Sequence, residues 1–63
     1  MTVKSDLKKA IASAQSAKGT YLVAAESTED QSAKDRYQQM ASDIDVHLEY
    51  LNSRLDYLSS QFL

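Results

Sequence analysis

The sequence contains no cysteine and no proline, and it has one glycine and one histidine among its 63 residues. Without cysteine the chain cannot build a disulfide framework, which argues against an oxidising compartment. A single histidine cannot form a metal site by itself. The absence of proline and the scarcity of glycine are typical of a chain that is helical along nearly its whole length.

Long apolar runs and an excess of positive charge are missing as well. No segment approaches the ~18 consecutive apolar residues of a membrane span. The lysines near the N-terminus are not followed by an apolar core long enough for a signal peptide. The net charge is −2, which argues against non-specific binding to nucleic acid. We therefore expect a cytoplasmic protein whose contact with membranes is at most peripheral.

The small size of the chain bears on assembly. Residues 1–63 form at most one domain. A pair of helices of this size buries too little apolar surface to offset the conformational entropy of folding, and small chains make up this shortfall with disulfides, a metal or oligomerisation. Because the first two are excluded by the composition, the sequence predicts an oligomer.

The second half of the chain carries a long helical pattern. Its apolar residues recur at spacings of three and four, the period of one face of an α-helix. This row consists of Ala33, Tyr37, Met40, Ile44, Leu48, Leu51, Leu55, Leu58 and Phe62. Val46, Tyr50 and Tyr57 form another row, which we expect to lie beside the first and to broaden the apolar face. The pattern predicts a helix over about 31–61.

A shorter amphipathic pattern comes before it. Its row consists of Val3, Leu7, Ala10, Ala14, Ala17, Tyr21 and Ala24. The pattern predicts a helix over about 3–27, with Thr2 as its N-cap. Small side chains in its middle permit a close approach of another helix. We expect Ala14 and Ala17 to face that helix and Ser16 to face solvent.

A polar run over residues 26–31 separates the two patterns and predicts a short turn. Asp30 is the preferred N-cap of the second helix, and Ser32 with Asp35 three residues later is the alternative. A short turn makes the two helices antiparallel neighbours, which pairs residues whose numbers sum to about 58. The predicted pairs are Tyr21 with Tyr37, Ala14 with Ile44, Leu7 with Leu51 and Val3 with Leu55.

The predicted fold is all-α, an antiparallel two-helix hairpin that dimerises into a four-helix bundle. The first helix is too short and too narrow to cover the whole apolar stripe of the second, so another chain must cover the rest. The end of the second helix, from Leu58 onward, is expected to extend past the start of the first. The predicted interface between chains consists of Leu48, Leu51, Leu55, Leu58 and Phe62.

Several short segments resemble a known family. They are the opening Met1-Thr2-Val3, the Thr28-Glu29-Asp30 turn and the words "SAKDRYQQMA" at residues 32–41. Together with the Ala/Ser-rich first helix, they resemble the domain-of-unknown-function family 1657, short proteins of endospore-forming Firmicutes. Its members are commonly encoded with sporulation membrane proteins. The resemblance implies a sporulation-associated role, a location in the forespore or spore, and a sporulation membrane protein as a partner. The family has no assigned catalytic residues.

The residues themselves predict no enzyme and no cofactor. With one histidine and no cysteine, no nucleophilic arrangement can be assembled. We therefore expect a small non-enzymatic assembly or accessory protein. One alternative is a metal- or ligand-binding bundle, since Asp43 and His47 stand one helical turn apart and a symmetric dimer would double them. The favoured interpretation makes His47 a packed or rim residue, with burial keeping its imidazole neutral.

The distribution of charge suggests a second alternative. Residues 1–27 carry a net charge of +2 and residues 28–63 carry −4. The favoured interpretation is a solvated, complementary rim around the helix contact. Alternatively, the end that contains Lys4, Lys8 and Lys9 could dock on an anionic membrane surface, which would make the protein a peripheral membrane adaptor.

Overall fold

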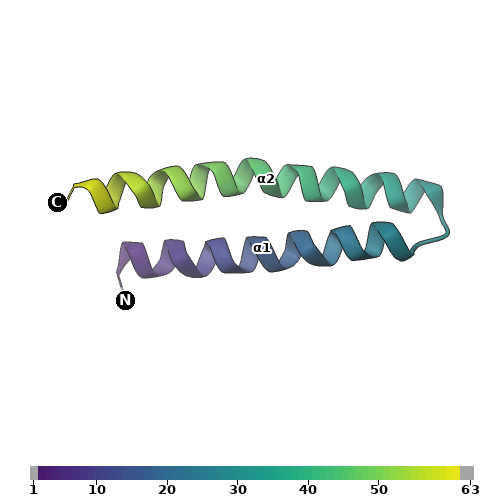
Figure 1. Ribbon diagram of the computed structural model, residues 1–63, viewed down its shortest axis with the longest axis horizontal. Helices are drawn as coiled ribbons and strands as arrows, with labels where there is room; N and C mark the ends of the chain where they lie inside the picture. The colour runs from purple at the N-terminus through teal and green to yellow at the C-terminus, as the bar shows by residue number, and fades with distance from the viewer. Residues whose placement is uncertain (1, 62–63) are drawn as a thin grey trace.

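The computed structural model of the protein describes residues 2–61. It consists of helix α1 (Val3–Ser27) and helix α2 (Gln31–Ser60), and the described residues contain no strand. The helices lie side by side and run antiparallel (Figure 1). They form a rod with extents of 50 × 18 × 12 Å. The prediction of an all-helical hairpin is confirmed.

Both helices begin at the N-caps that the sequence predicts. The Thr2 hydroxyl accepts a hydrogen bond from the backbone N–H of Ser5 at 3.0 Å. The Asp30 carboxylate accepts one from the backbone N–H of Ser32, also at 3.0 Å. Each bond satisfies an amide that has no partner inside its helix. Asp30, rather than Ser32, is therefore the cap of α2.

The connection between the helices is built without glycine or proline. The backbone N–H of Thr28 donates to the carbonyl of Ala24 and closes the last turn of α1. The Thr28 hydroxyl then accepts a hydrogen bond from the backbone N–H of Asp30 at 3.1 Å. Local side-chain bonds of this kind replace the left-handed residue that commonly ends a helix.

The contact between the helices follows a seam of residues spaced alternately by three and four. On α1 the seam consists of Leu7, Ile11, Ala14, Lys18, Tyr21 and Ala25, and on α2 of Tyr37, Ala41, Ile44, Leu48, Leu51, Leu55 and Leu58. This is the 3.5-residue period of an antiparallel coiled coil. Among the described residues, Ala25, Ala41 and Ile44 are the buried ones. The remaining seam residues are half-buried.

The seam of α1 differs from the predicted row in one respect. Ile11 is half-buried and lies on the seam, whereas Ala10 is exposed. Ala25, rather than Ala24, is buried. Spacings of three and four fit more than one row of the same helix, and the larger Ile11 side chain decides where the partner helix packs. The prediction that Ser16 faces solvent is confirmed.

The register agrees with the prediction near the turn and departs from it at the open end. The rings of Tyr21 and Tyr37 stack with centroids 6.4 Å apart, which confirms this predicted pair. Val3, however, lines a depression with Leu58, three residues beyond its predicted partner Leu55. Helical side chains lean toward the N-terminus of their own helix. Side chains of α1 therefore lean toward the open end and those of α2 toward the turn, which favours partners of higher number on α2, as in Val3 with Leu58 and Lys18 with Asp45.

This shift also corrects the prediction for the end of α2. The helix extends past the start of α1 (Figure 1). Leu58, however, does not protrude with it, because it is half-buried beside Thr2, Val3 and Lys4. Phe62, which the sequence predicts at the same exposed tip, lies outside the described residues.

Candidate functional site

The two broad faces of the hairpin differ in polarity. An ion pair between Lys18 Nζ and Asp45 Oδ1, 2.6 Å long, crosses the seam on one of them. With ~100° per residue along each helix, the side chains on that side can be identified. They are Lys8, Gln15, Lys18 and Leu22 of α1 and Lys34, Asp45, Asn52 and Ser59 of α2. We call this the polar face.

The opposite side of the seam carries rows that repeat every seventh residue. They are Val3, Ala10, Ala17 and Ala24 on α1 and Ala33, Met40 and His47 on α2. None of these residues is a lysine, arginine, aspartate or glutamate, although Arg54 continues the α2 row at its end. We call these seven residues the apolar face. The accessible parts of the seam residues Leu51 and Leu58 border it.

The leucines predicted to form the interface between chains lie on the seam. Leu48, Leu51, Leu55 and Leu58 are half-buried against α1. Their first role is therefore to hold the hairpin together. Part of each remains accessible, so an additional contact through them stays a prediction. The structure brings these four residues together in one line along α2.

His47 is exposed in the hairpin, so its expected burial is wrong for the single chain. It lies ~70° away from the centre of the seam. Asp43, its proposed co-ligand, accepts a hydrogen bond from the side-chain amide of Gln39 at 2.9 Å. Within residues 2–61 no group of three or more metal-binding side chains comes together. The arrangement supplies two donors at most from one chain.

The three lysines of the membrane-adaptor alternative do not form one patch. Lys4 is half-buried beside Val3 and Leu58, whereas Lys8 and Lys9 are exposed. Lys8 and Lys9 are adjacent in sequence and therefore point ~100° apart. Neither described helix is long and apolar enough to cross a membrane.

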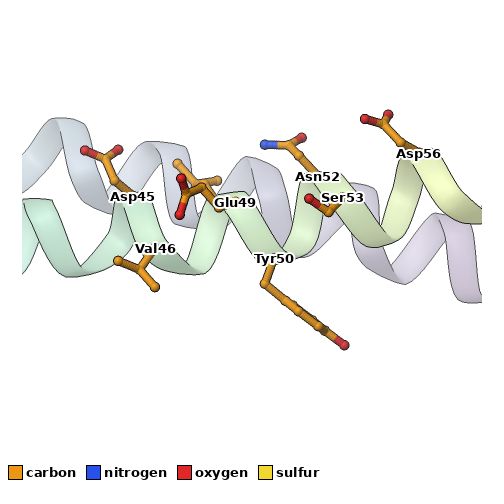
Figure 2. Close-up of a pocket in the computed structure, with 8 residues that line it drawn as sticks. Asp45, Val46, Glu49, Tyr50, Asn52, Ser53 and Asp56 are labelled. Atoms are coloured by element: carbon orange, nitrogen blue, oxygen red, sulfur yellow. The ribbon is translucent and has the colours of Figure 1, made fainter.

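The second apolar row lies elsewhere than expected. Val46, Tyr50 and Tyr57 are 62%, 67% and 53% exposed. They stand ~150° around α2 from the centre of the seam, so the expectation that they lie beside the seam row is wrong. In Figure 2, Val46 and Tyr50 point away from the side of α2 that carries Asp45 and Asp56. We call Val46, Tyr50 and Tyr57 the outer strip.

At one end of the outer strip, Tyr57 interacts with two neighbouring polar side chains. The guanidinium of Arg54 lies over the Tyr57 ring, 5.1 Å from its centroid. The Gln61 side-chain amide donates to the Tyr57 hydroxyl at 3.1 Å. The depression drawn in Figure 2 is lined only by α2 residues between Asp45 and Asp56. A surface made by one helix is open, and its chemistry suits contact with another protein rather than enclosure of a small molecule.

The sequence predicts the rows of apolar residues but does not distinguish the two broad faces. The distinction is visible in the sequence as small apolar residues repeated every seven positions on one flank of the seam: Val3, Ala10, Ala17 and Ala24. The repeat identifies an apolar face only because the Lys18–Asp45 pair marks the opposite flank as polar.

Comparison with known proteins gives one assignment. Residues 7–55 match the family model described as "Protein of unknown function (DUF1657)". No curated protein matches the chain. No solved structure matches it either.

Proposed function

We propose that this chain, which belongs to the DUF1657 family, is a non-enzymatic assembly protein that acts as a homodimeric four-helix bundle. The observation that carries the proposal is the small core of the single hairpin. Of the described residues, Ala25, Ala41 and Ile44 are buried, and the leucines of α2 are only half-buried. Chains of this size without disulfides or metal ions need further burial to be stable.

The apolar face supports one mode of assembly. A C2 dimer presents the same surface from both chains, and this face combines uncharged rows with the accessible parts of Leu51 and Leu58. Its α1 row contains three alanines, whose small side chains permit a close approach of the second hairpin. The polar face would then remain in water, where charged groups are best solvated. Dimerisation in this mode would cover Ala10 and His47, the exposed members in the middle of the face.

The cellular part of the proposal rests on the family resemblance alone. We propose a sporulation-associated role in the cytoplasm of the forespore or spore, with a sporulation membrane protein as a partner. Affinity capture from sporulating cells, compared with capture from vegetative cells, tests this part. Recovery of the same proteins from both preparations would contradict it.

Sedimentation equilibrium at micromolar concentration tests the dimer. We expect the wild type to have the mass of two chains and Ala17→Glu to shift toward one chain, because the new carboxylate would be buried in the interface. Gln15→Glu is the matched control, since it adds the same charge to the same helix on the polar face. A folded wild-type monomer, or equal dimerisation of both variants, would refute the proposed interface.

A further inference from the structure

The outer strip of α2 is not explained by the hairpin or by the proposed dimer. Val46, Tyr50 and Tyr57 are all more than half exposed. They occupy three turns of one helix side that points away from α1 and away from the centre of the apolar face. Large apolar side chains gathered on one side of a small protein indicate a contact with another protein.

The charges around the outer strip indicate what kind of surface would cover it. Asp43 and Glu49 flank the strip on its two sides beside Val46 and Tyr50, and both are exposed, whereas the guanidinium of Arg54 lies over the Tyr57 ring at one end. The part of the chain that contains α2, residues 28–63, carries a net charge of −4. A matching partner is therefore a helix with basic flanks and room for aromatic rings.

The chain itself carries a surface that meets this description. Residues 1–27, which contain α1, have a net charge of +2. Lys18 pairs with Asp45 and Lys4 is half-buried beside Leu58, so the basic groups toward the outward side are Lys8 and Lys9. The side of α1 that faces away from α2 carries Ala12, Ser16 and Gly19, all exposed, with Lys8 at its border. A Cβ atom placed on Gly19 would meet nothing within 4 Å. Tyrosine rings could lie flat over this part of the helix.

We infer that the outer strip of one copy docks on the outward side of α1 in a second copy, so that hairpins join side by side. Each added copy would repeat the order α1, α2, α1, α2 and place an acidic helix beside a basic one. The two surfaces are different, so the contact is heterologous and leaves a free strip at one end and a free α1 at the other. It uses none of the residues of the apolar face and does not depend on the dimer.

Sedimentation velocity over a range of concentrations tests this inference. We expect the wild type to form species larger than a dimer as concentration rises, and to lose them at high salt because the flanking charges are screened. Tyr50→Ser on the strip and Ser16→Gln on α1 should each weaken this association by about tenfold or more. Asn52→Ser, an exposed change on the polar face of the same helix, should have no effect. Circular dichroism is the control that each variant remains helical.

A mixing experiment tests the heterologous geometry. In an Ala17→Glu background, which removes the proposed dimer, Tyr50→Ser retains an intact α1 surface and Ser16→Gln retains an intact strip. Neither alone should associate, whereas a mixture of the two should form pairs and no longer chains. A mixture that behaves like its components would overturn the inference. So would a wild type that never exceeds the dimer, or unchanged association of both variants, in which case the strip serves another protein.

The outcomes also separate this contact from the proposed dimer. Loss of the dimer with retention of the larger species refutes the dimer and supports the side-by-side contact. A stable dimer without larger species supports the dimer and refutes the side-by-side contact.

Discussion

Lys18 and Asp45 form an ion pair across the hairpin, with Nζ 2.6 Å from Oδ1, on one side of the seam. Their side chains are 34% and 55% exposed, so water screens the attraction and the pair contributes little to stability. The pair marks one broad face of the hairpin, and the alanine and methionine rows lie on the other.

The weak contribution of this pair can be measured. We expect Lys18→Ala to lower the free energy of unfolding by less than about 1 kcal/mol, and the loss to shrink at high salt. Urea denaturation at two salt concentrations provides the measurement, with the exposed Lys8→Ala as the control. A loss several times larger that persisted in high salt would show that the pair has a structural role beyond charge attraction.

The seam leucines should make a much larger contribution. Leu51 is half-buried in the hairpin and borders the apolar face. We expect Leu51→Ala to cost ~2–5 kcal/mol per buried site, and a C2 dimer would contain the change twice. Val46→Ala, on the exposed outer strip, is the comparison and should cost far less. Urea unfolding curves that give the two variants equal stability would contradict the assigned roles.

The small residues of α1 offer a test of the face assignment. Ala14 lies on the seam and is half-buried, whereas Ser16 is exposed. Enlarging Ala14 to Leu should overpack the contact with α2 and destabilise the fold by ~1–3 kcal/mol. The same enlargement at Ser16 should leave the melting temperature of the dilute protein nearly unchanged. Equal melting temperatures for the two variants would show that the helix is rotated differently.

Gly19 is a position where stability can be gained. It lies in the interior of α1 with a helical backbone, and a Cβ atom there would meet nothing within 4 Å. Gly19→Ala should therefore stabilise the protein by ~0.5–1 kcal/mol, because alanine loses less conformational freedom on folding. Thermal melts of Gly19→Ala and of the reverse change Ala12→Gly, an exposed site on the same helix, check this. A drop in melting temperature for Gly19→Ala would indicate that the space beside residue 19 is occupied, as it would be in a side-by-side assembly.

Local rules in the sequence determined the helices, their caps and the turn. Thr2 and Asp30 cap the helices because their side-chain oxygens reach free amides a few residues later, and such bonds depend only on neighbouring residues. The antiparallel arrangement followed from the short connection, and the Tyr21–Tyr37 contact followed from the position of the turn. Near the turn the chain has little freedom to slide.

Only the tertiary structure decided how each helix is rotated about its own axis. Rows at spacings of three and four overlap on a helix, so the sequence allowed Ala10 or Ile11 on the seam and placed Val46 and Tyr50 beside it. Packing of α1 on α2 selected Ile11 and left Val46 and Tyr50 exposed. It also left His47 in solvent and set Leu58 beside Val3. These outcomes depend on contacts between residues far apart in the chain, where side-chain size and lean determine which atoms meet.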